Sequence, residues 1–385
     1  TKLVAAQARF FKDRLVLGVG YRWDTLEVEN YGSLRNPQTR FWETNYAAPI
    51  AKSSYEGRTK TFGVVGHITK NISAFYNKSD NFGLPGSQRL QPHGDFPPNP
   101  ESVGEDMGIS LDLFGGKVVA RASYYTVNLN NGANFNYGGT LTNPSSISRI
   151  ILDALVNQAI ITEATAAPHR SISTGATFNR LVEGYELNLT ANPTRNWSLS
   201  ANFSITDGMV SNVAPEIKQW VADHMPFLQT PAYQNVVTGN AAMTVAAVIE
   251  DFFEYHQSQL DSEGLVLPGN RKYKANLFTA YSFSQGRLKG LRVGGGYTWQ
   301  SKLPVGIVNT TSLRYANDTW NTNAMVSYRF RNFDRLPWVK NLRLQLNVFN
   351  VTDDDEPTII RYASNDPANV GYNVIRRIRT KDPRT

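Results

Sequence analysis

Residues whose types could support catalysis or metal binding are spread singly along this 385-residue chain. The five histidines share no His-x-x-x-His spacing, the pattern that places two imidazoles of one helix on one metal ion, and cysteine is absent. They are His67, His93, His169, His224 and His256. We therefore predict no catalytic residue, no metal site and no cofactor, and we do not expect an enzyme.

Two short clusters offer further chemistry. Residues 353–356 (DDDE) could bind Ca²⁺ through clustered carboxylates, but a solvated turn at the end of a strand is the favoured interpretation. Gly294, Gly295 and Gly296 do not form a phosphate-binding loop, because an alternating segment continues on both sides and no helix follows. We expect these glycines to ease curvature or to allow a close approach of another backbone.

The composition excludes a bundle of apolar membrane helices. Hydrophobic residues make up 41% of the chain, charged residues make up 18%, and the mean hydropathy is −0.37. No segment approaches the roughly 20 consecutive apolar residues that a spanning helix needs. The net charge is +7, but the lysines and arginines form no basic stripe, so we expect no nucleic-acid partner.

The strongest pattern is alternation of apolar and polar residues, which predicts strands with one face of each kind. In residues 342–348, Leu, Leu, Leu and Val alternate with Arg, Gln and Asn. Roughly thirteen or fourteen such segments recur, at about the ten-residue length that a tilted strand needs to cross a bilayer. Further examples are 15–23, 107–113, 185–191, 197–206, 291–300 and 320–330. We predict an all-β fold, a transmembrane antiparallel up-and-down β-barrel, with residues 1–385 forming part of one barrel domain.

Short and long links alternate between these segments. Tight turns are expected at 11–14, 69–71, 115–116 and 192–196, where Gly, Asn, Asp and Pro gather. Long excursions are expected at 25–58, 80–105, 130–171, 207–270, 301–318 and 351–371. This sorting is typical of a membrane barrel with periplasmic turns and extracellular loops. Apolar residues at helical spacing predict short helices in those loops, at 145–166, 215–225 and 243–260.

Candidate binding residues follow from this arrangement. If the apolar faces contact lipid, the intervening polar residues point into the barrel, where they would hydrate the lumen or simply pair with one another. These lumen candidates are Arg22, Arg121, Arg292, Gln300, Arg343 and Gln345. Aromatic and basic residues of the long excursions are candidates for ligand contact: Tyr31, Trp42, Tyr46, Trp220, Arg314 and Tyr315.

Several motifs occur in a fixed order along the chain. Residues 7–15 (QARFFKDRL) are followed by 20–24 (GYRWD), and then come 72–79 (ISAFYNKS), 183–187 (EGYEL) and 347–353 (NVFNVTD). The first two segments look like a barrel hairpin of TonB-dependent outer-membrane receptors, and the others are similar to later barrel segments of that family, in the same order. The resemblance implies a complete barrel of about 22 strands. Nothing here matches the family's plug domain, its TonB-contacting box or its final strand, so we expect a partial chain.

The resemblance also implies a function and partners. It implies active import across the Gram-negative outer membrane by a multi-pass barrel, in contact with lipid and lipopolysaccharide. Energy would come from TonB, with ExbB and ExbD, through the plug that this chain lacks. A ferric siderophore is the first expected cargo, with cobalamin or an oligosaccharide as alternatives.

Three other interpretations stay open. The first is a passive porin, although porin loops are usually shorter than residues 207–270. The second is an outer-membrane barrel enzyme, which would need a linked nucleophile or acidic pair. The third is a soluble β-rich adhesin, which would not require detergent.

Overall fold

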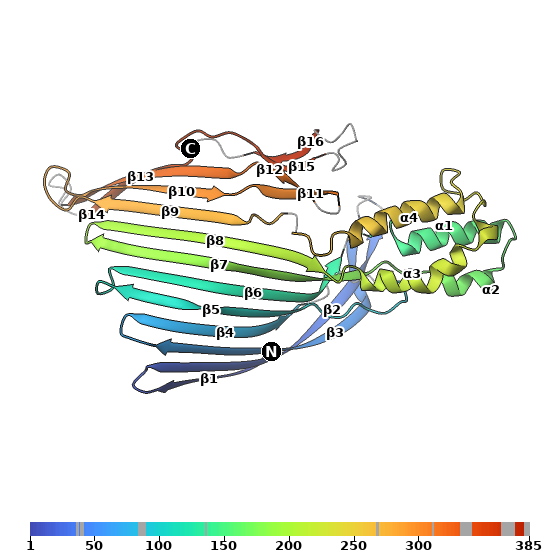
Figure 1. Cartoon of the computed structure of the whole chain (residues 1–385), viewed down its shortest axis with the longest axis horizontal. Coiled ribbons are helices and arrows are strands. Elements are labelled where there is room, and N and C mark those ends of the chain that lie inside the picture. Colours follow the sequence, from blue (N-terminus) through green and yellow to red (C-terminus); the bar gives the residue numbers. More distant parts are fainter. Residues whose placement is uncertain are drawn as a thin grey trace.

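The computed structural model describes residues 1–35, 38, 42–83, 90–134, 137–266, 269–309, 312–331, 341–362 and 374–380. Its main feature is a twelve-stranded antiparallel sheet in the order β1-β2-β3-β4-β5-β6-β7-β8-β9-β10-β13-β14 (Figure 1). These strands are β1 (Lys2–Phe10), β2 (Leu15–Arg35), β3 (Trp42–His67), β4 (Ile72–Phe82), β5 (Glu101–Leu113), β6 (Val118–Asn134), β7 (Ala176–Thr194), β8 (Trp197–Ser211), β9 (Tyr273–Ser282), β10 (Leu291–Gln300), β13 (Thr319–Arg331) and β14 (Asn341–Val348). Consecutive strands are neighbours, so the predicted up-and-down antiparallel fold is confirmed.

Two small hairpins accompany the main sheet. One consists of β11 (Leu303–Asn309) and β12 (Ser312–Ala316), and the other of β15 (Thr358–Tyr362) and β16 (Ile375–Arg379). Within the described residues, β1 and β14 each pair with one neighbour and not with each other. The described part of the sheet is therefore open.

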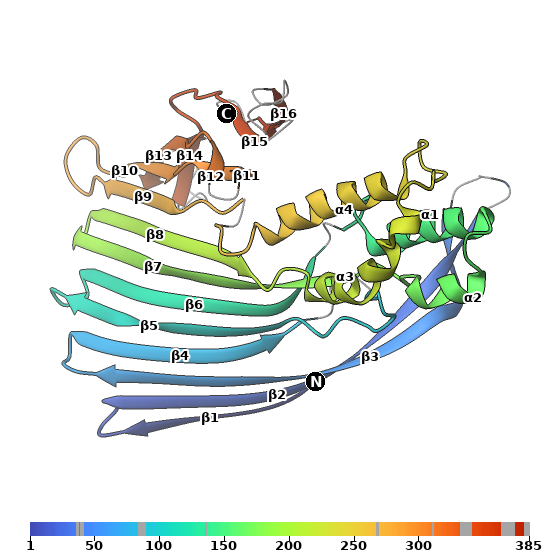
Figure 2. The same cartoon turned by 45° about the vertical axis from the view of Figure 1, so that its right-hand side comes forward.

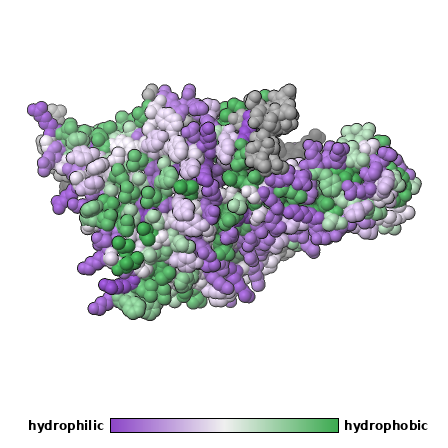
Figure 3. All heavy atoms as spheres, in the orientation of Figure 1, coloured by the Kyte–Doolittle hydropathy of each residue, from purple (hydrophilic) through white to green (hydrophobic). Residues whose placement is uncertain are grey.

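The register sorts the side chains of the main sheet onto two faces, because paired residues project from the same side of a sheet. One face carries large apolar side chains that stay exposed: Leu187 is 48% exposed and Leu344 is 57% exposed. Figure 3 shows such hydrophobic residues spread over the strands, with hydrophilic residues along the turn rim and toward the helices. We call this the apolar face, and we call the opposite side the polar face. An exposed apolar surface of this extent is what a barrel strand presents to lipid.

The links are sorted between the two ends of the sheet (Figures 1 and 2). Short turns at 11–14, 68–71, 114–117 and 195–196 join strands at one end, as predicted. At the first of these, Phe11, Lys12 and Asp13 all have positive φ, which a tight reversal of the chain requires. The helices lie at the opposite end.

Two of the long excursions contain more strand than predicted. Residues 25–58 were expected as a long excursion between strands, but β2 continues to Arg35 and β3 begins at Trp42. The two strands stay paired from Leu15↔Gly66 to Arg35↔Trp42, with irregularities near Tyr31. Backbone pairing between β2 and β3 therefore continues well beyond residues 15–23, the segment in which apolar and polar residues alternate. Residues 301–318, also expected as a loop, likewise contain the β11–β12 hairpin.

The predicted helices form a separate unit at the long-loop end. They are α1 (Pro144–Asn157), α2 (Glu163–Ala166), α3 (Pro215–Leu228) and α4 (Val245–Leu260), with short 3₁₀ turns η1 (Ala167–His169) and η2 (Pro231–Tyr233). We call these elements the helical cap (Figure 2). No helix among the described residues is long and apolar enough to cross a membrane.

The helical cap has its own hydrophobic core. Fully buried side chains from α1, α3 and α4 meet there, including Ile151, Trp220 and Phe252. Side-chain caps begin α1 and α4: Asn143 accepts from the Ser146 amide at α1, and Thr244 accepts from the Ala247 amide at α4. This core makes the cap a packed body rather than a set of independent loops.

Candidate functional site

All six predicted lumen residues lie on the polar face. The register connects them through unbroken pairings, for example Ser110↔Arg121 in β5 and β6, and Ser327↔Gln345 in β13 and β14. Tracing these pairings across the sheet places each of the six on the same side as the others. Whether that side bounds a lumen stays a prediction.

A stacked group in the middle of the polar face shows how the strands position their side chains. Gly108 in β5 pairs with Phe75 in β4, and the missing side chain leaves room for the Phe75 ring. The Arg121 guanidinium lies 3.9 Å from the centre of that ring. Its Nη2 donates to Asp106 Oδ2 at 3.0 Å. The result is a fixed, charge-balanced cation above an aromatic ring.

A cavity of about 350 Å³ lies beside this stack. All of its lining residues belong to the polar face: Asp106, Arg121, Ser123, Tyr125, Glu186 and Asn188. The Tyr125 hydroxyl shares a hydrogen bond of 2.8 Å with Thr206, and the Asn202 amide donates to Asn188 at 2.7 Å. Hydroxyl, amide and carboxylate groups of this kind can bind a polar ligand but include no activated nucleophile.

The other lumen candidates also have polar neighbours. Arg22 Nε donates to Asp24 Oδ2 at 2.6 Å, and Gln345 donates to Asn347 at 2.9 Å. Gln300 ends β10 and lines a cavity of about 480 Å³ together with Arg271 and Lys274. Arg271 is buried and donates to the carbonyl of Asn317 at 3.1 Å. Arg292 and Arg343 line a different cavity, at the turn end of the sheet.

The predicted ligand residues of the long excursions are not gathered in one element. Tyr31 and Trp42 lie in β2 and β3, but their side chains are outside the described part of the structure. Tyr46 in β3 is 77% exposed, and Arg314 and Tyr315 lie in β12, where Tyr315 is half exposed. Exposed rings at this end of the molecule remain candidates for ligand contact.

Trp220 differs from the other ligand candidates because it is completely buried in the helical cap. Its ring makes an edge contact with Phe252 at 6.0 Å and lies 5.7 Å from the His224 ring. The i, i+3 spacing of Ile217 and Trp220 in α3 turns both toward the cap core. In this structure Trp220 therefore packs the cap and is not available on its surface.

Three histidines that are far apart in the sequence meet in the helical cap, a cluster that the sequence analysis missed. His169 Nδ1 and His224 Nδ1 are 3.3 Å apart, so one ring can donate to the other. The His93 ring centre is 5.6 Å from that of His224, and His93 Nε2 lies 3.2 Å from Asp223 Oδ2. His169 also stacks on Phe227 at 3.9 Å. Only tertiary folding brings these segments together, so spacing could not reveal them.

Burial disfavours the charged form of two of these rings, His169 and His224. It lowers the pKa of His169, and burial together with the neighbouring His169 and His93 lowers the pKa of His224. A hydrogen bond from Gln219 lowers the pKa of Asp223. The described residues contain no group of three or more His, Asp or Glu side chains placed to hold a metal ion.

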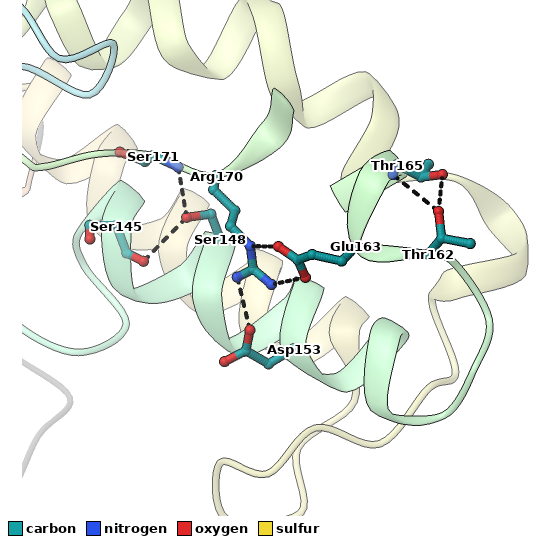
Figure 4. A network of polar contacts seen from close by, with 8 residues as sticks. All are labelled: Ser145, Ser148, Asp153, Thr162, Glu163, Thr165, Arg170 and Ser171. Carbon is teal, nitrogen blue, oxygen red and sulfur yellow. Dashed lines mark hydrogen bonds and ion pairs between the residues drawn. The ribbon is translucent and has the colours of Figure 1, made fainter. Parts of the chain in front are cut away.

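An arginine network fastens η1 to the rest of the cap (Figure 4). Arg170 Nε and Nη2 donate to the two carboxylate oxygens of Glu163, each at 2.8 Å. Its Nη1 donates to Asp153 in α1, also at 2.8 Å. The Ser148 hydroxyl accepts from the Ser171 amide at 3.1 Å. Because one guanidinium binds both Glu163 and Asp153, it fixes the orientation of the segment that carries His169.

The acidic run 353–356 directly follows a turn at 351–352, after β14. Asn350 accepts from the Asp354 amide at 3.1 Å, and Asp354 accepts from the Glu356 amide at 3.0 Å. These contacts use the side chains to close the turn, which agrees with the interpretation favoured from the sequence.

Comparisons with known proteins agree with this architecture. The family model described as TonB dependent receptor-like, beta-barrel matches residues 3–351. Similar solved structures include BauA, the ferric preacinetobactin receptor of Acinetobacter baumannii (TM-score 0.60, 13% identity, 99% of this chain and 41% of that chain), and the siderophore receptor PiuA of the same organism (0.54, 16%, 96% and 40%). Another is Pseudomonas aeruginosa FpvA bound to a heterologous pyoverdine (TM-score 0.51, 15% identity, 99% of this chain and 46% of that chain). At these identities the likeness concerns the fold.

The chain spans less than half the length of each of these three structures. No curated protein matches the sequence. The family match nevertheless covers most of the chain, and the sheet order, the two faces and the sorted links agree with it. The chain therefore belongs to the TonB-dependent receptor family, whose β-barrel model matches residues 3–351.

Proposed function

We propose that this chain forms part of an outer-membrane barrel whose apolar face contacts lipid and whose polar face lines the interior. The exposed leucines and aromatic residues of the apolar face support this orientation, since a water-facing surface would not keep so many of them. The short-turn end would then face the periplasm and the helical cap would face the outside.

The function that this arrangement supports best is import of a scarce substrate, energised by TonB with ExbB and ExbD. The observation that carries the proposal is the family match over residues 3–351. A ferric siderophore is the proposed cargo, because BauA is a ferric preacinetobactin receptor, PiuA is a siderophore receptor, and FpvA was solved in complex with a pyoverdine and iron. Cobalamin and oligosaccharides are the other cargoes to test. No catalysis is proposed.

Uptake in living cells tests this proposal. In iron-starved cells, deletion of the gene that encodes this chain should abolish uptake of radiolabelled iron bound to the cognate siderophore. Loss of TonB should abolish it equally, because an energised importer needs coupling to the inner membrane.

Three results would overturn parts of the proposal. Uptake that persists without TonB would indicate a passive channel. Expression that rises under glycan feeding and not under iron starvation would exclude a siderophore as the cargo. Turnover of a lipid or peptide by the purified protein would contradict the absence of catalysis.

A further inference from the structure

Four basic residues line one cavity. They belong to strand ends and a link that meet at the short-turn end of the sheet, opposite the helical cap (Figure 1). Lys289 comes from the β9–β10 link, Arg292 from β10, Arg329 from β13 and Arg343 from β14. The cavity measures about 790 Å³, which lies within the range of about 300–1,000 Å³ that is usual for small-molecule sites.

The register places three of these cations on the polar face. Arg292 pairs with Ser327, and Arg329 pairs directly with Arg343. Like charges directly opposite one another on neighbouring strands are destabilising. This arrangement therefore costs stability unless something neutralises it.

The charges in this cavity are not balanced by the described protein groups. No carboxylate lines the cavity among the described residues, and within that part of the chain none of the four cations forms an ion pair. Arg292 Nε is buried without a hydrogen-bond partner, and Arg343 Nη2 donates to the Ser327 hydroxyl at 3.3 Å. Elsewhere on the same face, Arg22 and Arg121 each have an aspartate partner.

We propose that this cavity, the basic pocket, binds a small anion that carries two or more carboxylate or phosphate groups. Planar guanidinium groups bind such oxyanions through paired hydrogen bonds. The hydroxyls of Ser282, Ser284 and Ser327 supply further polar groups to the lining. The pocket size favours a small molecule over an acidic polypeptide. The basic pocket is a site separate from the proposed import function, because anion binding at the turn end of the sheet can be measured without transport.

Titration of the purified full chain in detergent, at low ionic strength, tests the proposal. Citrate and inorganic phosphate are the two probes, and acetate is the monovalent comparison. We expect saturable citrate binding by calorimetry, weaker phosphate binding, negligible acetate binding, and loss of affinity as salt is added. Arg292→Gln and Arg343→Gln should each weaken citrate binding at least tenfold.

Lys274→Gln is the matched control. It removes one positive charge from the polar face, since Lys274 pairs with Gln300, but it lies outside the basic pocket. Its citrate affinity should stay within twofold of the unmodified protein. Lys289→Gln, in an exposed link, tests the pocket again if a strand variant fails to fold.

Either of two outcomes would overturn the proposal. One is equal loss of citrate affinity in Lys274→Gln and Arg292→Gln, which would indicate general attraction to a basic surface. The other is no binding by the unmodified protein, together with lower thermal stability in both arginine variants, which would indicate that an acidic segment of the protein fills the pocket.

Discussion

Gly108 is a residue on the polar face that leaves no room for a side chain. A Cβ placed there would lie 2.1 Å from the Ala122 carbonyl oxygen and 2.9 Å from the Phe75 ring. We expect Gly108→Ala to push β5 from β6 and to lower the free energy of unfolding by about 1–3 kcal/mol. Chemical denaturation in detergent micelles measures the change.

Gly18 in β2 provides the matched control for this substitution. It is also a strand glycine, but a Cβ there would meet nothing within 4 Å. Gly18→Ala should therefore leave the unfolding midpoint almost unchanged. Equal destabilisation by the two variants would show that a general intolerance of strand glycines to alanine, rather than the Phe75 and Ala122 contacts, is responsible.

His256 should make the stability of the helical cap depend on pH. The ring is buried, its Nδ1 lies 2.8 Å from the Tyr137 hydroxyl, and burial lowers its pKa from 6.5 to about 4. As the pH falls, His256 is therefore protonated at a higher pH in the unfolded chain than in the folded protein. The stabilisation is complete above about pH 7 and is lost between pH 6.5 and pH 4, by on the order of 3 kcal/mol.

Hydrogen exchange of the α4 amides at several pH values measures this loss. His256→Gln keeps an acceptor for Tyr137 but cannot take up the proton, so its exchange rates should depend less on pH after correction for intrinsic exchange. His67→Gln, near the turn end, is the control and should keep the original profile. An unchanged profile in His256→Gln would exclude this histidine as the source.

At the scale of elements, the helical cap should unfold without the sheet. Trp220→Ala leaves a cavity at the centre of the cap core, and such truncations cost about 3–5 kcal/mol. The sheet keeps its own backbone ladders, so faster hydrogen exchange should be confined to α1, α3 and α4. Val237→Ala, at a half-exposed cap residue, should change exchange little. Equal acceleration in the β5 and β6 amides would show that the cap and the sheet unfold as one unit.

Local pattern was sufficient to predict most elements. Residues 291–300 alternate throughout and form β10, and apolar spacing at 243–260 predicted a helix that the structure places at Val245–Leu260. Each of these segments carries its own period, of two or of 3.6 residues, because one face is apolar.

The structural features that the sequence patterns did not predict depend on contacts between distant segments. In the outer half of β2, apolar alternation is limited to Leu26 and Val28, which is too short a run to predict the backbone ladder within residues 25–58. The histidine cluster required His93, His169 and His224 to meet from three separate segments. The burial of Trp220 could have been predicted from its i, i+3 spacing with Ile217. Its aromatic side chain instead suggested contact with a ligand.

At the scale of the whole molecule, adjacent residues of β7 should respond oppositely to a new charge. Leu187 lies on the apolar face and Asn188 lies on the polar face. In lipid vesicles, Leu187→Arg should lower the free energy of unfolding by about 2–4 kcal/mol if the site lies near the bilayer midplane. Asn188→Arg should cost far less, because it faces polar groups.

Folding into vesicles, followed by the heat-dependent shift in gel mobility, measures this difference. Both variants add the same charge to the same strand, so each serves as the control for the other. If Asn188→Arg proved as costly as Leu187→Arg, the assignment of the apolar face to lipid would be wrong.

The sequential pairing of the strands also has a consequence for biogenesis and divergence. Each strand of the main sheet lies against the strand that the chain formed just before it, apart from the small hairpin between β10 and β13. Growth of the sheet can therefore proceed one hairpin at a time, without threading a segment between strands already in place. An insertion between β6 and β7 leaves every strand pairing of the main sheet intact. Loop segments at the long-loop end can therefore be gained or exchanged without any change in the sheet that carries them.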